Sequence, residues 1–452
     1  MRTLAPAAAA PDAAPTPVSL EPEVRALGHR IAAEQARAPR SAGRAFEDRG
    51  MELLARDPQL RAALFRLVDV APACATPREL ADHLGALLGE VERKLPIGAA
   101  RRPLAGRLAG VAVHRMAQRF IVGQGPRDAV PALARLWRAG AAASVDLLGE
   151  ATVTAAEADR YTARCDEALR ILASAARGWV GAHPQLERDG AGALPRVNLS
   201  VKVSAMTPHV RADAPELGVA DAAGRLRSLL RTARDVGAHL HIDMESMDTR
   251  ALITDLVMEV LAEPEFREGP SAGIVLQAYL RDADEQLDRL LEGYAAAERT
   301  TPLTIRLVKG AYWDHEVVQA AQNGWTPPVF TDRRECDRNF EKLTKVLIDN
   351  AGPVRVAIAS HNLRSISAAA AYADARRVGN DLLEFQILRG LGDDTQAAIA
   401  ATGRRVRCYC PVGDLVAGMA YLVRRLLENT ANDSFLAAAA GGANTAELLE
   451  AP

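Results

Sequence analysis

Short strand-like runs alternate with longer helical stretches from about residue 140 onward. Alternation of this kind is typical of βα units and indicates an α/β fold with a parallel sheet. The predicted strands cover 142–148, 197–203, 239–244, 273–279, 303–309, 354–360, 383–388 and 405–409. The predicted helices between them cover 153–177, 219–236, 248–262, 283–297, 334–350, 365–375 and 393–402. Eight such repeats favour a closed (β/α)8 barrel, which we place over residues 139–436.

The N-terminal part of the chain has a different pattern. Residues 19–138 are rich in Ala, Leu and Arg, and stretches of them repeat apolar positions about every 3.6 residues, which predicts an all-helical region. Residues 1–18 are rich in Ala and Pro, and we expect a disordered tail there. A second, flexible tail is expected over residues 437–452.

Polar residues alternate with apolar ones in four of the predicted strands, whereas buried parallel strands usually are continuous apolar runs. Because successive side chains of a strand point to opposite faces, the apolar set must face the outer helices and the polar set must face the lumen. The polar set is Asn198, Ser200, Lys202, Ser204, His239, His241, Asp243, Glu245, Thr304, Arg306, Arg405, Arg407 and Tyr409.

A lumen this polar is costly unless its groups form hydrogen bonds. A polar heteroaromatic cofactor across the mouth of the barrel would satisfy them. Ordered water together with internal ion pairs is the alternative, and the pattern itself leaves both open.

Lys202 and Asp243 lie at the C-terminal ends of their strands, which is the catalytic face of a barrel. A lysine there is able to form a Schiff base, but only with a lowered pKa and an apolar pocket. The neighbouring charges of Asp243, Glu245 and Arg306 favour a charge network instead.

A helix expected near the C-terminus carries Tyr421, Arg424, Arg425 and Glu428 on one polar face. Two adjacent arginines form a good receptor for a small carboxylate, because a guanidinium binds it through two parallel hydrogen bonds. A solvated face with an Arg–Glu pair is the alternative.

Two other strand ends carry candidate binding residues. After the fifth strand, Gly310 allows a ligand to approach the backbone closely, and Tyr312 and Trp313 offer rings for stacking. His361 ends the sixth strand, where it would contact a phosphate or a ring carbonyl. Plain packing of these side chains is the alternative in both places.

The composition narrows the class of protein. The 452 residues are 49% hydrophobic and 25% charged with a net charge of −2, so no charge excess points to nucleic acid. No apolar stretch has the length of a membrane span, and the Pro-broken N-terminus lacks the apolar core of a secretory signal. Five cysteines without a framework of spacings indicate a reducing cytoplasm, and Cys408 and Cys410 alone are too few ligands for a metal site.

Eight motifs then occur in the order found in a known family. They are Asp146–Glu150, Val201–Ala205, Ile242–Glu245, Leu276–Tyr279, Ile305–Trp313, Ser360–Asn362, Tyr409–Gly413 and Tyr421–Asn429. The series resembles the proline dehydrogenase domain of bacterial proline-utilisation flavoenzymes over roughly residues 105–436. The helical N-terminal part is similar to the arm and helical region that precede the barrel in bifunctional members.

The resemblance implies a distorted (β/α)8 barrel that binds FAD and oxidises L-proline to Δ1-pyrroline-5-carboxylate by hydride transfer from C5 to flavin N5. The residues that would bind or enclose proline are Lys202, Asp243, Tyr409, Tyr421, Arg424, Arg425 and Glu150. Lys202 and the two arginines would hold the carboxylate, and Glu150 would pair with Arg424 as a gate. The residues that would contact FAD are Gln277, Arg306, Val308, Gly310, Ala311, Trp313, His361, Asn362, Glu428, Ser434 and Phe435.

The chain departs from the family pattern at three places. The segment 333–337 lacks the usual Lys-x-x-Thr-Asp run, Arg389 follows the seventh strand, and Cys410 replaces a usual alanine. These changes leave open the same flavin chemistry on another cyclic or N-alkylated amino acid. A Schiff-base lyase that uses Lys202, or a catalytically silent barrel, is the more distant alternative.

The resemblance also implies partners. A quinone-type compound would accept the electrons, and no aldehyde dehydrogenase module follows the barrel in this sequence. We therefore expect a monofunctional enzyme that works with a separate pyrroline-5-carboxylate dehydrogenase. We place it in the cytoplasm, with peripheral association with the inner membrane as a second option, and expect no nucleic-acid partner.

Overall fold

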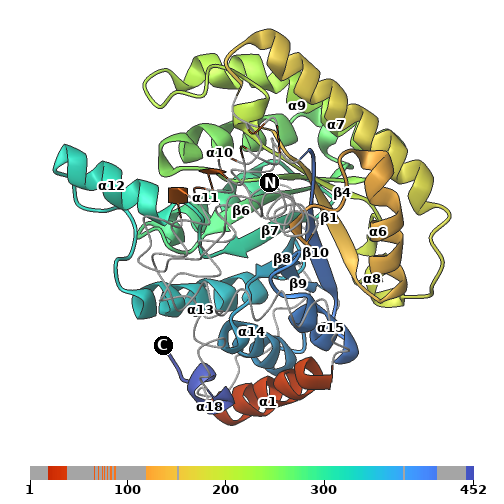
Figure 1. Ribbon diagram of the computed structural model, residues 1–452, viewed down its shortest axis with the longest axis vertical. Coiled ribbons are helices and arrows are strands. Elements are labelled where there is room, and N and C mark those ends of the chain that lie inside the picture. The colour runs from red at the N-terminus through yellow and green to blue at the C-terminus, as the bar shows by residue number, and fades with distance from the viewer. Residues whose placement is uncertain are drawn as a thin grey trace, which may run out of the picture.

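The computed structural model describes residues 19–37, 119–149, 152–379, 382–414 and 444–452, together with isolated positions between 66 and 87. Its centre is a closed barrel of eight parallel strands with helices around it (Figure 1). The strands lie in the order β1-β10-β9-β8-β7-β6-β5-β4, so each repeat adds its strand beside the previous one. The prediction of a (β/α)8 barrel is therefore confirmed.

The eight barrel strands fall where the sequence pattern predicts them. They are β1 (Ala142–Leu147), β4 (Asn198–Val201), β5 (His239–Ile242), β6 (Ser271–Gln277), β7 (Leu303–Val308), β8 (Val354–Ala359), β9 (Leu383–Leu388) and β10 (Val406–Val412). Strands β4 and β5 are only four residues long, which puts Lys202 and Asp243 in the loops that follow them.

The outer helices cover the strands on all sides of the barrel. They are α6 (Pro126–Arg138), α7 (Ala155–Ala176), α9 (Pro215–Val236), α10 (Met247–Leu261), α11 (Ala283–Ala296), α12 (Trp313–Asn323), α13 (Arg333–Asp349), α14 (Leu363–Ala375) and α15 (Asp393–Ala401). Local capping fixes where several of them begin. For example, Thr154 and Glu157 form a reciprocal capping box at the start of α7, and Asp332 accepts two backbone N–H bonds at the start of α13. None of the helices in the described ranges combines the length and the hydropathy that a membrane span requires.

The alternation of side chains divides the strands into an outer apolar face and a polar lumen. Leu199, Leu240 and Ile305 are fully buried under the helices, and a buried side chain of this size contributes about 1.5–3 kcal/mol to folding. Polar neighbours such as Ser200 and His241 are equally buried, but they point into the barrel.

A short hairpin closes the N-terminal end of the barrel. It consists of β2 (Arg188–Asp189) and β3 (Gly192–Ala193), which pair antiparallel just before β4. The Asp189 carboxylate accepts two hydrogen bonds from Arg355 on β8, at 2.6 and 3.0 Å. The floor of the lumen is therefore held by a buried ion pair.

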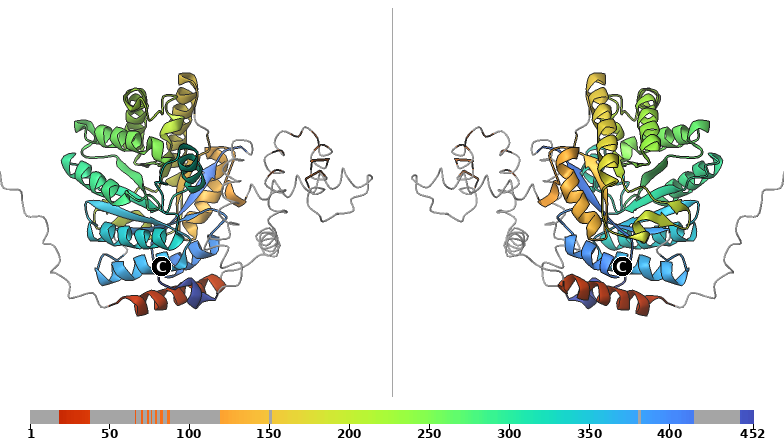
Figure 2. Two further views of the ribbon diagram at one scale, coloured as in Figure 1. Left: turned by 90° about the vertical axis from the view of Figure 1, so that its left-hand side faces the viewer. Right: turned by 90° about the vertical axis from the view of Figure 1, so that its right-hand side faces the viewer.

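Helix α1 (Glu21–Arg37) packs across α14 and α15 on the outside of the barrel, next to α18 (Thr445–Leu448), as Figure 2 shows. Residues 444–452, which belong to the expected C-terminal tail, contain a short helix that packs against α1. A capping box formed by Asn444 and Glu447 starts α18, and Leu449 is buried against Gly28 of α1. A helix of four residues is too short to show a hydrophobic period, so the pattern gave no sign of it.

Candidate active site

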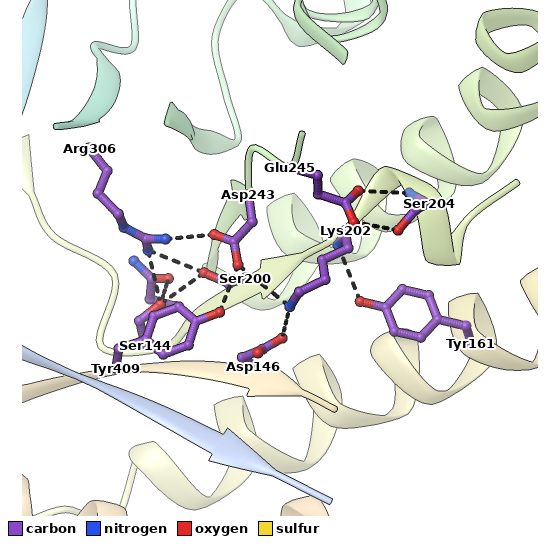
Figure 3. Close-up of polar contacts among 11 residues, drawn as sticks. Ser144, Asp146, Tyr161, Ser200, Lys202, Ser204, Asp243, Glu245, Arg306 and Tyr409 are labelled. Atoms are coloured by element: carbon purple, nitrogen blue, oxygen red, sulfur yellow. Dashed lines mark hydrogen bonds and ion pairs between the residues drawn. The ribbon is translucent and has the colours of Figure 1, made fainter. Parts of the chain in front are cut away.

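Five polar side chains meet at the C-terminal end of the lumen, and we call them the upper cluster (Figure 3). They are Asp146, Lys202, Asp243, Arg306 and Tyr409. They come from β1, β7 and β10 and from the residues that follow β4 and β5. Parallel strands all end on the same side of a barrel, which brings side chains far apart in sequence together there.

Asp243 is the centre of the upper cluster. Its carboxylate accepts a hydrogen bond from Arg306 Nη1 at 2.6 Å and another from the Tyr409 hydroxyl at 2.7 Å. The Lys202 ammonium lies 3.8 Å from the same carboxylate. The guanidinium of Arg306 also lies over the Tyr409 ring, 5.4 Å from its centroid. One carboxylate thus orients two cations and a phenol.

Lys202 forms a second, closer ion pair with Asp146, at 2.7 Å. Burial lowers the pKa of Lys202, but the Asp146 and Asp243 carboxylates oppose it, and the net effect is a pKa above the usual range. The amine is therefore held in its charged form. A Schiff base requires a neutral amine, so the Lys202 lyase alternative is disfavoured, whereas binding of an anionic group is favoured.

Small hydroxyl groups support Arg306 from below. Its Nη2 donates to the hydroxyl oxygens of Ser144 and Ser200, at 3.3 and 3.2 Å. The Ser144 hydroxyl in turn donates to the Asn198 amide oxygen at 2.7 Å. Sequence reasoning placed Ser200 and Asn198 in the lumen but did not single out Ser144. The alternation of Ser144 and Asp146 with apolar neighbours in the first strand was the available signal.

Two further contacts near Lys202 were also missed. The buried Tyr161 hydroxyl on α7 accepts the Lys202 backbone N–H at 3.3 Å, just where β4 ends. Ser204 donates both its N–H and its hydroxyl to Glu245, at 3.2 and 2.6 Å. The helix pattern of α7 gives no hint that one tyrosine points at a strand end.

Two buried polar atoms beside the upper cluster lack a hydrogen-bond partner among the described residues. They are Oε1 of Gln277, at the end of β6, and Nε of Arg306. The other side of the Gln277 amide is used, because its Nε2 donates to the Glu245 carbonyl at 2.9 Å. Buried polar atoms are normally paired. The wall of the lumen therefore offers one acceptor and one donor to a bound molecule.

The segment after β7 carries most of the other expected cofactor contacts. Val308 ends the strand, and Gly310, Ala311 and Trp313 lead into α12. Gly310 has φ +140°, and a Cβ there would lie 2.5 Å from the ring of Tyr279. The glycine is thus required by contact with Tyr279 as well as by its backbone. Trp313 donates its indole N–H to the Phe330 carbonyl at 2.9 Å and leaves its ring partly exposed.

His361 and Asn362 follow β8 at the same end of the barrel. The Nε2 atom of His361 accepts the Leu388 N–H at 3.0 Å, which ties it to the end of β9. Asn362 caps α14 by accepting the N–H groups of Arg364 and Ser365. Both residues therefore have structural partners, and their contact with a cofactor stays a prediction.

The three departures from the family pattern occupy different surroundings. Asp337, in the altered segment 333–337, pairs with Lys309 after β7 and lies 3.8 Å from Arg333. Cys410 is buried and alternates with Tyr409, so it faces the outer helices. Arg389 donates its backbone N–H to the Tyr409 carbonyl at 3.0 Å. The effect of Arg389 on a bound cofactor stays a prediction.

Seven of the expected site residues lie outside the described residues. They are Glu150, Tyr421, Arg424, Arg425, Glu428, Ser434 and Phe435. The carboxylate clamp and the gate therefore stay predictions. Within the described part of the chain, no group of His, Cys, Asp and Glu is arranged to hold a metal ion.

Comparison with known proteins gives two family matches. A model of the proline dehydrogenase family matches residues 129–438, and a model of the proline utilization A N-terminal domain matches residues 21–137. The bifunctional protein PutA of Escherichia coli is 30% identical over 347 residues, which are 75% of this chain and 25% of that protein. The proline dehydrogenase of Deinococcus radiodurans is 29% identical and covers 77% of this chain and 98% of its own length.

Solved structures give the same relationship. The crystal structure of proline utilization A from Bdellovibrio bacteriovorus inactivated by N-propargylglycine superimposes with a TM-score of 0.88 at 35% identity. It covers 96% of this chain, which corresponds to 44% of that chain. A crystal structure of a mutant of proline utilization A from Bradyrhizobium japonicum gives a TM-score of 0.74 at 26% identity. The chain thus spans about a quarter of the length of the curated PutA protein it matches and under half of these solved structures.

Proposed function

Because the chain belongs to the proline dehydrogenase family, we propose that it binds FAD and oxidises L-proline to Δ1-pyrroline-5-carboxylate. The observation that carries the proposal is the pair of buried atoms beside the upper cluster that have no hydrogen-bond partner in the part of the chain that the structure describes. The Gln277 amide oxygen calls for an N–H donor, and the Arg306 Nε–H calls for an acceptor. The edge and centre of an isoalloxazine ring offer both, so the residues fit a flavin.

The protein's part in this reaction is to bind and orient. Bound FAD would supply N5 as the acceptor of the hydride that leaves proline C5. Lys202 keeps its charge and faces the lumen, so it binds the carboxylate of proline, together with Arg424 and Arg425. Tyr409 is held by Asp243 and presents its ring to the substrate. Fixing both ends of proline in this way aligns its C5 for transfer.

Further residues complete the proposed cofactor site. Val308, Gly310, Ala311 and Trp313 would line the flavin and its phosphate chain along the segment after β7. His361, Asn362, Glu428, Ser434 and Phe435 would contact the remainder of FAD. As part of the same proposal, a quinone-type compound accepts the electrons and a dehydrogenase consumes the product.

An absorbance spectrum tests the proposal directly. The purified protein should show a flavin band in the visible blue, and L-proline should bleach it in the absence of oxygen. Bleaching by a different imino acid but not by proline would shift the assignment to that substrate. A protein that neither carries nor takes up flavin would overturn the proposal, and borohydride trapping of a carbonyl substrate on Lys202 would then point to lyase chemistry.

The carboxylate clamp has its own test. We expect Arg424→Met and Arg425→Met each to raise KM for L-proline about tenfold to a hundredfold, because losing one desolvated charged hydrogen bond costs about 1.5–3 kcal/mol. Steady-state kinetics on flavin-loaded protein measure this. An unchanged KM in both variants would remove the assignment of these arginines to the carboxylate.

A further inference from the structure

We propose that Ser204 and Glu245 form a positioning bridge that fixes the Gln277 amide for FAD and ties it to the loop after β1. The inference rests on the proposed function, since it concerns how the flavin is held. The bridge consists of the two hydrogen bonds from Ser204 to the Glu245 carboxylate, which Figure 3 shows beside the upper cluster. Neither residue belongs to the set expected to touch substrate or cofactor.

The bridge acts where the backbone has little other support. Residues 243–246, between β5 and α10, form neither helix nor strand. In this segment the Asp243 N–H donates to the Val201 carbonyl at 2.9 Å, and the Glu245 carboxylate receives both bonds from Ser204. Hydrogen bonds to a charged acceptor are stronger than neutral ones. The carboxylate therefore determines where the Glu245 main chain lies.

The position of that main chain sets the direction of the Gln277 amide. Gln277 Nε2 donates to the Glu245 carbonyl at 2.9 Å, so the amide nitrogen is used inside the protein. Its Oε1 is buried and has no partner in the described part of the chain. An amide that turned over would offer a donor there in place of an acceptor. By fixing the amide, the bridge keeps the Gln277 oxygen available as an acceptor. This favours a ligand whose edge carries an N–H group.

The same bridge reaches the loop after β1. Thr152 donates its N–H and its hydroxyl to the Ser204 carbonyl, at 3.0 and 3.2 Å. Thr152 follows Glu150 by two residues, and Glu150 is the expected gate over the substrate. A continuous series of hydrogen bonds, Thr152–Ser204–Glu245–Gln277, therefore joins Thr152 to the residue that would hold the flavin edge.

A double-mutant cycle on the binding of FAD tests the bridge. The variants are Ser204→Ala and Glu245→Ala, each in the unaltered protein and in a Gln277→Leu background, with Ser204→Thr as the conservative variant. Ser246→Ala is the matched control, because Ser246 is a neighbouring serine whose side chain makes no capping bond. The readouts are the FAD dissociation constant, from quenching of flavin fluorescence, and the melting temperature of the flavin-free protein.

We expect Glu245→Ala to weaken FAD binding about tenfold and Ser204→Ala to weaken it about threefold to tenfold. Ser204→Thr should restore most of the affinity, and Ser246→Ala should leave it unchanged. In the Gln277→Leu background neither bridge variant should weaken binding further, because coupled residues are not additive.

Two results would overturn the bridge. Equal losses with and without Gln277 would show that Ser204 and Glu245 act through general stability, and a lowered melting temperature with unchanged affinity would show the same. If Glu245→Ala does not fold, Ser204→Ala decides the question alone. FAD binding by the unaltered protein separates the proposed function from the bridge. If the unaltered protein binds FAD and the variants bind it equally well, only the bridge fails. If the unaltered protein does not bind FAD, both proposals fail.

Discussion

The two ends of the barrel lumen use buried charges in different ways. At the N-terminal end each carboxylate is held by a guanidinium through two hydrogen bonds: Glu384 by Arg407 at 2.8 and 2.9 Å, and Asp189 by Arg355 at 2.6 and 3.0 Å. We call these the lower pairs. In the upper cluster one of the two carboxylates, Asp243, is shared among Arg306, Tyr409 and Lys202, and Arg306 keeps a donor that has no partner among the described residues.

The difference shows that one polar lumen can serve both structure and ligand binding. A carboxylate and a guanidinium that are joined by two parallel hydrogen bonds neutralise each other's charge. The lower pairs therefore need no bound molecule and have a structural role. In the upper cluster the charges of Lys202 and Arg306 are balanced by those of Asp146 and Asp243, but hydrogen-bonding capacity is left over, which is costly without a ligand. The two explanations that the sequence pattern left open, internal ion pairs and a bound cofactor, therefore apply to different ends of the same barrel.

The largest expected effect comes from breaking a lower pair. Glu384→Gln keeps the size of the side chain but removes the charge opposite Arg407, which is buried. A buried charge without its partner costs about 3–5 kcal/mol, so we expect the free energy of unfolding to fall by about that amount. Urea unfolding of the flavin-free protein measures it.

A double replacement provides the control for this prediction. Glu384→Leu with Arg407→Met removes both charges and should recover most of the lost stability, because apolar side chains of similar volume often replace a buried pair at no cost. A Glu384→Gln protein as stable as the unaltered one would mean that the lower pairs do not hold the barrel floor.

Most of the fold was predictable because the pattern of the strands is regular. Each barrel strand was predicted to within a few residues, since apolar runs of that length between amphipathic helices have few other interpretations. The polar lumen followed from the two-residue period of a strand, and Lys202, Asp243 and Arg306 do point into it.

Partner choice inside the lumen could not be read from the sequence in the same way. Nothing in the order of residues shows that Lys202 pairs with Asp146 more closely than with Asp243, or that Tyr161 of α7 bonds the Lys202 backbone. These contacts depend on the register of one strand against the next, which only the closed barrel defines. The docking of residues 444–452 was missed because Leu449 packs against a helix about 420 residues away in sequence.

Neutralising Asp243 tests the upper cluster with the same kind of change. Asp243→Asn keeps the shape of the side chain but removes the charge that holds Arg306 and Lys202. We expect kcat/KM for L-proline to fall about tenfold to a hundredfold, which corresponds to about 1.5–3 kcal/mol of lost charged hydrogen bonding. Glu384→Gln is the matched control and should change kcat/KM of its folded, flavin-loaded form by less than about twofold. Equal kinetic losses in both variants would remove the distinction between the two ends.

The boundary between the two ends is marked by two stacked histidines, His239 and His241 on β5. Burial lowers the pKa of both well below the usual range, and the charges of Arg306 and Arg407 lower it further. Below about pH 6.5 the unfolded chain therefore takes up protons that the native protein does not. We expect stability to fall as pH decreases from 6.5 towards 5, by up to about 1.4 kcal/mol per pH unit for each histidine. Replacing both histidines with Gln should flatten the dependence of the free energy of unfolding on pH in this range. An unchanged dependence would mean that other groups cause it.

The smallest expected effect tests whether Asp243 orients Tyr409 or only neutralises its neighbours. Tyr409→Phe keeps the ring beside the Arg306 guanidinium but removes the hydroxyl that donates to Asp243 at 2.7 Å. One hydrogen bond to a carboxylate is worth about 1.5–3 kcal/mol when fully desolvated, and less here because Tyr409 is only partly buried. We expect about 1 kcal/mol, or roughly a fivefold loss in kcat/KM, with no change in the affinity for FAD. A loss as large as that of Asp243→Asn would mean that the carboxylate acts mainly through the phenol, and the shared charge would then not be what separates the upper cluster from the lower pairs.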